Sequence, residues 1–163
     1  MSEVDYIIRD LKISQRAQFN MIEFYKTIKS WFEINRYDFY ERDYQEVQKG
    51  KKKNVKITWI GEKEINDYSK LVIKVNIKLD NYEIIENTKE KLVDGKLSIS
   101  FESLVESDYE KKWEISPIWQ FIRSVSDKYF TEKKRKMFEK ELHNDTYDIC
   151  TKVKTFLNLY KFS

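Results

Sequence analysis

Apolar and polar residues alternate between Leu71 and Leu79, and this alternation limits what the chain can fold into. The odd-numbered positions are all Leu, Ile or Val, and the even-numbered ones are Val72, Lys74, Asn76 and Lys78. A period of two is that of a β-strand, whose successive side chains point to opposite faces of a sheet. The segment therefore predicts a strand in a sheet with one apolar face and one mostly polar face.

Turn-forming pairs recur on both sides of this strand, at Lys49-Gly50, Asn66-Asp67, Asp80-Asn81 and Asp94-Gly95. The last is the strongest hairpin signal, since a type I′ turn needs positive φ at both central positions, which Asp tolerates and Gly accepts freely. The turns delimit predicted strands over 36–48, 54–65, 68–79, 82–93 and 96–105. We expect these strands to form a five-stranded antiparallel meander.

Helical spacing is found on both sides of the meander. A β-branched segment over 4–13 predicts an amino-terminal strand, and apolar residues spaced by three and four then predict a helix over 14–34, capped by Ser14. Ser116 and Pro117 predict the start of a helix over 117–130. A longer helix is predicted over 132–160, with Thr131 as its cap. At 1.5 Å per residue it would span roughly 43 Å, about the strand length.

These elements predict an α+β fold in which the last helix covers the apolar face of the sheet, and 163 residues fit one domain over 1–163. The order strand, helix, meander, long helix resembles the helix-grip fold of the START and Bet v 1 type. That resemblance implies a gap under the last helix that holds an apolar ligand. No individual residues of that family can be matched here. As an alternative function, we consider a carrier of an apolar small ligand, with a cavity between the last helix and the sheet lined by Ile57, Trp59, Ile73, Val75, Ile99 and Phe101.

The composition indicates a globular chain with a highly charged surface. Charged residues make up 36% and hydrophobic residues 40%, while 31 basic and 28 acidic residues leave a net charge of only +3. Cys150 is the single cysteine, which favours a reducing compartment. No secretory signal and no run of apolar residues long enough for a membrane span is present, so we expect the cytoplasm.

The residues that carry most enzyme chemistry are scarce. His143 is the one histidine, and no Gly-rich phosphate loop is found. The densest possible metal site is Glu141, His143, Asp145 and Asp148. The three carboxylates share a face of the predicted last helix and His143 points elsewhere, and a solvated helix face is the commoner reason for such charges. Asp145 also lies on the apolar stripe, where it must be paired or exposed. We predict neither an enzyme, nor a cofactor, nor a metal site.

Lysines gather near one turn. In a five-stranded meander the Gly50 turn and the exit of the last strand share an end of the sheet. This predicts one basic cluster of Lys49, Lys51, Lys52, Lys53, Lys111 and Lys112. The hypothesis is a non-catalytic binding module that contacts a nucleic acid or an anionic membrane surface; a protein partner stays open, and ordinary solubility of a lysine-rich chain is the alternative. On the polar face, a nucleic acid would meet Tyr40, Tyr44, Lys56, Lys74 and Lys78.

Overall fold

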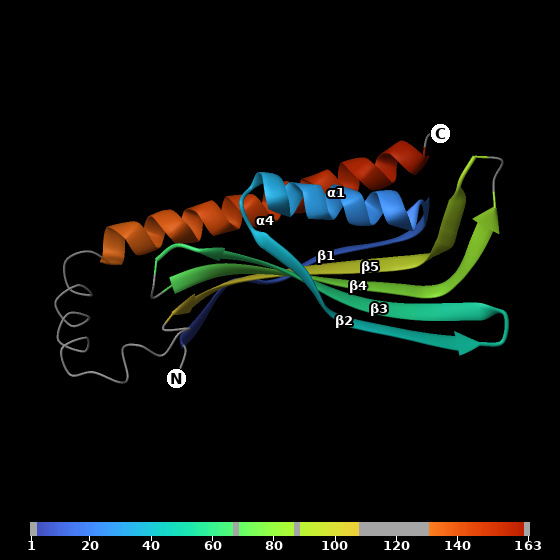
Figure 1. Ribbon diagram of the computed structural model, residues 1–163, viewed down its shortest axis with the longest axis horizontal. Coiled ribbons are helices and arrows are strands. Elements are labelled where there is room, and N and C mark those ends of the chain that lie inside the picture. Colours follow the sequence, from blue (N-terminus) through green and yellow to red (C-terminus); the bar gives the residue numbers. More distant parts are fainter. Residues whose placement is uncertain (1–2, 67–68, 87–88, 108–130, 162–163) are drawn as a thin grey trace.

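The computed structural model describes residues 3–66, 69–86, 89–107 and 131–161, which form one sheet and two helices (Figure 1). In chain order the elements are β1 (Glu3–Phe19), α1 (Met21–Ile34), β2 (Asp38–Lys49), β3 (Lys52–Glu64), β4 (Ser69–Glu86), β5 (Lys91–Ser107) and α4 (Thr131–Lys161). The predicted α+β class and the long last helix are confirmed. The predicted helix over 117–130 lies outside the described residues.

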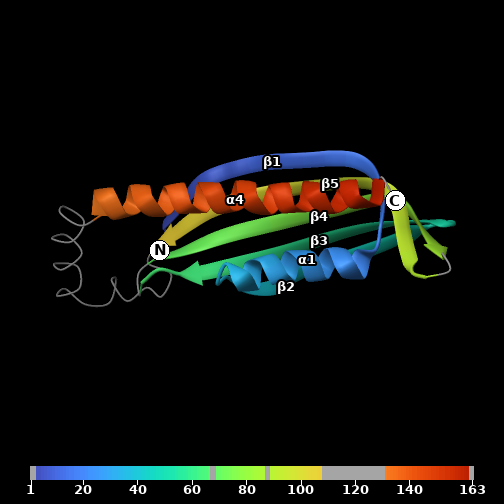
Figure 2. The same ribbon diagram turned by 90° about the horizontal axis from the view of Figure 1, so that it is seen from above.

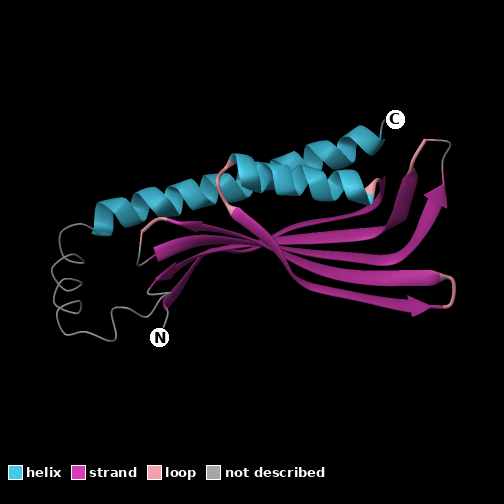
Figure 3. Cartoon of the chain, viewed as in Figure 1, coloured by secondary structure: helices cyan, strands magenta, loops and turns pink. Residues whose placement is uncertain are grey.

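The five strands form one antiparallel sheet in the order β1-β5-β4-β3-β2. Both helices lie on the same face of this sheet (Figure 3). Seen from above, α4 runs along β1 and β5, while α1 lies beside α4 on the side of β3 and β2 (Figure 2). The other face of the sheet carries no described helix, and we call it the helix-free face.

The amino-terminal strand is longer than predicted, and the first helix begins later. The predicted helix start at Ser14 is wrong, because Ile13, Ala17 and Phe19 are buried while the even positions between them are exposed, which is the period of a strand. The cap is Asn20, whose side-chain oxygen accepts hydrogen bonds from the amides of Ile22 (3.0 Å) and Glu23 (3.2 Å).

Two of the four predicted turns are confirmed and two are wrong. The chain turns at Gly50, where φ is +65°, and at Asn66, whose side chain accepts a 2.7 Å hydrogen bond from the Ser69 amide. Asp80-Asn81 is instead a bulge within β4, and Asp94-Gly95 lies within β5. The meander thus has four strands, β2 to β5, and β1 completes the five-stranded sheet.

Gly95 is required for space rather than for a turn. It pairs with Ala17 of β1 and lies against the bulge of β4, where an added Cβ would come 2.8 Å from the Tyr82 Cβ atom. The local Asp-Gly signal was therefore overridden by strand pairing with β1, a partner distant in sequence. Beyond this point the β4–β5 hairpin curves toward the helix side (Figure 1).

The core lies between the sheet and the two helices. The alternating residues of β4 from Leu71 to Leu79 are buried there, at 0 to 2% exposure. From α4 the core receives Leu142, Ile149, Val153 and Phe156, so the prediction that this helix covers the apolar face is confirmed. From α1 it receives Phe24 and Phe32, and the Phe24 ring lies 6.0 Å from that of Trp59.

We expect Gly61→Ala to destabilise the fold. A Cβ at this position of β3 would overlap the buried Phe32 ring, and overpacking of this kind costs about 1–3 kcal/mol of unfolding free energy. Urea denaturation measures the loss. Phe32→Ala opens space at that point, so the double variant Gly61→Ala with Phe32→Ala should lose less unfolding free energy than the sum of the losses of the two single variants. A loss equal to that sum would contradict the contact.

Candidate functional site

The helix-free face is built from the polar half of the strand alternation. The neighbours of buried Ile57 and Ile77 in sequence are Lys56, Thr58, Asn76 and Lys78, and they point away from the helices. Lys56 is exposed, and the Lys78 side chain is 52% exposed. Lys74 lies on the same face. Tyr40, the partner of Ile60, lies on this face too, so four of the five residues that the sequence placed there do so; the placement of Tyr44 is wrong, because it pairs with Ile57 and faces the helix side.

The hairpin between β2 and β3 presents lysines around Gly50. Lys49 and Lys52 are direct cross-strand partners on either side of the turn. Lys51 is exposed in the turn itself, whereas Lys53 faces the helix side, as the partner of buried Tyr82, and lies 3.9 Å from Glu46. By the alternation of β3, Lys52 shares the helix-free face with Lys56. The turn and this face thus form one continuous lysine-bearing surface.

Two lysine pairs oppose each other across neighbouring strands. Lys49 is paired with Lys52, and Lys56 with Lys78. Like charges placed directly opposite on one face of a sheet destabilise it, whereas opposite charges at the same positions would stabilise it by about 0.2–1 kcal/mol. Lysine faces lysine twice at this end of the sheet, and Arg16 faces Lys96 there as well.

Acidic residues also lie on the helix-free face, so its charge is mixed. Asp80 is 3.6 Å from Lys78, and Asp43 faces Thr58 across β2 and β3. Glu102 is the cross-strand partner of Lys74. At the Asn66 end, Lys70 bridges Glu62 (3.2 Å) and Glu106 (3.5 Å). The surplus of positive charge is confined to the Gly50 end.

The predicted grouping of lysines from two segments rests on a wrong strand count. With four meander strands, β5 ends at Ser107 beside Ser69, at the Asn66 end of the sheet. The exit of the last strand therefore lies opposite the Gly50 turn. Lys111 and Lys112 lie outside the described residues, and their part in the site stays a prediction.

The residues expected to line a ligand cavity lie where they were predicted, beneath the helices. Ile57, Trp59, Ile73, Val75, Ile99 and Phe101 are 0 to 4% exposed and belong to the core that α1 and α4 complete. Trp59 contacts three aromatic rings, those of Phe24, Tyr25 and Phe39. These contacts favour core packing, and the ligand cavity stays a prediction.

A polar seam joins α4 to the other elements, and the sequence indicated only its acidic half. Three carboxylates on one face of α4 each accept a hydrogen bond from a different element. These are Glu141 from Lys63 (2.9 Å), Asp145 from the Tyr37 hydroxyl (2.8 Å) and Asp148 from the Trp31 indole (2.7 Å). Asp145 is thus paired, one of the two outcomes expected. The donors are scattered over 31–63, so spacing alone could not identify them.

The seam is electrostatically suited to hold α4 in place. Burial raises the pKa of Asp145, although the Tyr37 hydrogen bond lowers it in part. Burial and, second, the hydrogen bond to Asp145 raise the pKa of Tyr37 far above its ordinary value, so its hydroxyl stays protonated and donates. One oxygen of each carboxylate is bound to a protein donor, and no metal-ligating cluster is found in the described part of the chain.

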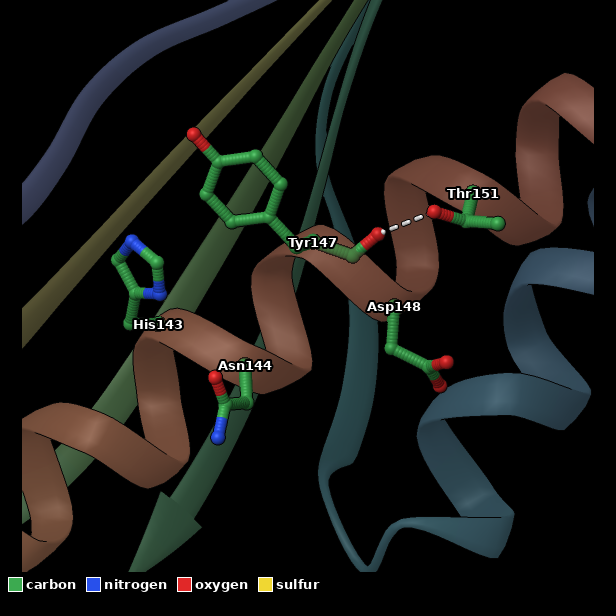
Figure 4. Close-up of a pocket in the computed structure, with 5 residues that line it drawn as sticks. All are labelled: His143, Asn144, Tyr147, Asp148 and Thr151. Atoms are coloured by element: carbon green, nitrogen blue, oxygen red, sulfur yellow. Dashed lines mark hydrogen bonds between the residues drawn. The ribbon is translucent and has the colours of Figure 1, made fainter.

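A surface pocket of about 350 Å³ lies on the solvent side of α4 (Figure 4). His143, Asn144, Tyr147, Asp148 and Thr151 line it, and all five belong to this one helix. The rings of His143 and Tyr147 lie 4.8 Å apart, and the Thr151 hydroxyl donates to the Tyr147 carbonyl. Among the residues that the structure describes, no other element contributes a polar group to this pocket.

Comparison with protein-family models, with curated proteins and with solved structures finds no match for this chain. The likeness to the helix-grip fold therefore rests on element order alone. Among the described helices, neither combines the length and the apolar character that crossing a bilayer requires. The function must be argued from the residues of this chain.

We expect Asp145→Asn to change how stability depends on pH. The folded-state pKa of Asp145 is raised, so the folded chain binds the carboxyl proton of Asp145 more tightly than the unfolded chain does. In the unfolded chain an aspartate has a pKa of about 3.9. The stabilisation is complete below that pH and is lost as pH rises through the raised pKa. In urea unfolding across this pH window, the unfolding free energy of the variant should increase relative to that of the native protein as pH rises.

Tyr37→Phe supplies the opposite test of the seam. Loss of the hydroxyl removes the hydrogen bond that lowers the pKa of Asp145, so the decline of stability with pH should become larger than in the native protein. The variant should also lose about 1–3 kcal/mol of unfolding free energy, since a partly buried carboxylate is left short of a donor. Parallel pH profiles for all three proteins would contradict the assignment.

Proposed function

We propose that this protein is a non-catalytic binding module of the cytoplasm that contacts an anionic macromolecule. The contact surface consists of Lys49, Lys51 and Lys52 at the Gly50 turn, continued by Lys56 and Lys78 on the helix-free face, with Lys53 at the same turn on the helix side. The observation that carries the proposal is the pair of lysine–lysine oppositions, Lys49 with Lys52 and Lys56 with Lys78.

An anionic partner gives these oppositions a physical reason. A surface that serves solubility alone is best made with both signs of charge interspersed, as around Lys70, which lies between Glu62 and Glu106. At the Gly50 end, lysine faces lysine instead. A polyanion would relieve that repulsion and gain from each lysine it neutralises.

Two further features support a binding role rather than catalysis. The Cys150 thiol is buried, and this burial raises its pKa, which disfavours the reactive thiolate. The His143 ring lies against Tyr147, with both side chains on α4. For the location, the support is the composition: a single cysteine suits a reducing compartment.

The proposal predicts that one double variant, Lys52→Glu with Lys56→Glu, separates binding from stability. Each change converts a lysine–lysine opposition into a Glu–Lys pair, so the unfolding free energy should rise by some tenths of a kcal/mol. Retention on immobilised heparin should fall, and the variant should elute at clearly lower salt than the native protein. Urea denaturation and a salt gradient measure the two effects.

The matched control is Lys140→Glu with Lys154→Glu. Both lysines are exposed on α4, across the sheet from the proposed surface, and the net charge changes by the same amount. Elution of this control should stay much closer to that of the native protein. Equal losses in both double variants, or retention that does not respond to salt, would refute the proposed surface.

A further inference from the structure

The helix-free face carries two cross-strand rows of polar side chains beside the lysine turn. Each row crosses the whole sheet, with one residue from each strand, and strands about 4.8 Å apart make it roughly 19 Å wide. From β2 to β1 the first row is Gln45, Lys56, Lys78, Ser98 and Ser14, and the second is Asp43, Thr58, Asn76, Ser100 and Lys12.

We propose that these rows bind the phosphate backbone of a double-stranded nucleic acid. This inference rests on the proposed function and names its partner. Lysine ammonium groups, hydroxyls and side-chain amides are the groups that proteins use to contact phosphates. The ten positions hold three lysines, six uncharged hydrogen-bonding residues and one carboxylate, Asp43. Two further carboxylates contact the rows from outside, Asp10 at Lys12 (3.3 Å) and Asp80 at Lys78 (3.6 Å), which leaves Lys56 as the lysine of the rows without a described ion pair.

Some donor groups of the two rows are not used in hydrogen bonds within the sheet and can bind a partner. The Thr58 hydroxyl donates to the Asn76 Oδ1 atom (3.2 Å), which leaves the Asn76 amide hydrogens for an acceptor outside the sheet. The hydroxyls of Ser14 and Ser98 lie 3.4 Å apart. Ser100 donates to Asp10 (2.9 Å), so the β1 end of the second row is already occupied. The central donors are therefore Lys56, Lys78 and Asn76.

The aromatic residues of the described sheet lie away from these rows. Tyr40, on the same face, belongs to the row of Ile60, and its hydroxyl donates to Glu62 (3.0 Å). Tyr44 is the partner of Ile57 and faces the helix side. Proteins that bind single strands stack the bases on exposed aromatic rings. Rows without such rings suit a partner whose bases are already stacked on each other.

Charge density and polarity also favour a duplex. A duplex carries one negative charge per about 1.7 Å of axis, twice the density of a single strand, so few lysines meet many phosphates. A membrane surface would be expected to receive apolar side chains inserted at the headgroup level, and the two rows contain none.

The test compares four probes with the full-length protein: heparin, a mixed-sequence duplex, one of its strands alone, and phosphatidylserine vesicles. We expect the duplex to bind at least roughly tenfold more tightly than the single strand, independently of its sequence. The logarithm of affinity should fall with the logarithm of salt concentration with a slope of roughly −3 to −4, as for about four neutralised phosphates. Lys52→Glu with Lys56→Glu should make that slope shallower.

Asn76→Asp tests the rows separately from the turn. The aspartate keeps the shape and can still accept the Thr58 hydrogen bond, but it replaces an amide donor by a negative charge, so duplex affinity should fall roughly tenfold. Asn158→Asp, at an exposed position of α4, is the matched control and should bind as the native protein does.

The outcomes distinguish the two proposals. Binding to heparin together with an equal or higher affinity for the single strand, or for vesicles, would overturn the duplex inference and leave the proposed function standing. Absence of binding to all four probes would overturn both. An Asn76→Asp protein that keeps native duplex affinity would show that the rows are not the contact surface.

Discussion

Burial of one face of the sheet under α1 and α4 is the constraint on which the rest of the structure depends. The apolar positions of β3, β4 and β5 must be covered along their length, and α4 supplies Leu142, Ile149, Val153 and Phe156 for this purpose. Because side chains alternate along each strand, fixing the apolar row on one face also fixes which polar residues lie on the other. The positions of Lys56 and Lys78 are therefore consequences of the core.

The polar seam adds direction to this burial. Apolar contacts alone would allow α4 to slide or rotate over the sheet, since dispersion and the hydrophobic effect are weakly directional. Hydrogen bonds from Trp31, Tyr37 and Lys63 reach three carboxylates of α4 that lie about one helical turn apart, and together they favour one register of the helix. Near the beginning of the helix, the exposed Arg135 side chain also contacts Asp5 of β1.

Much of the fold could be predicted from the sequence, because in long periodic segments the spacing of apolar residues shows which face is buried. The alternation in β4 and the stripe of α4 are such segments. Asp94-Gly95 was wrongly predicted to be a turn, because a turn signal is local. The pairing of Gly95 with Ala17, which keeps this segment in a strand, joins distant parts of the chain. The miscounted turn then placed the exit of β5 at the wrong end. Likewise, Lys56 and Lys78 become neighbours only once the register of β3 and β4 is known.

The position of β1 has a consequence for how the chain is made. β1 is an edge strand, and its neighbour in the sheet is β5, so that Glu3 pairs with Ser107 and Phe19 with Val93. A ribosome releases β1 long before β5, and the first strand must wait unpaired while the three others form. Lys12 and Arg16, which alternate with its apolar residues, are charges of the kind that keep such a waiting strand from aggregating with other nascent chains.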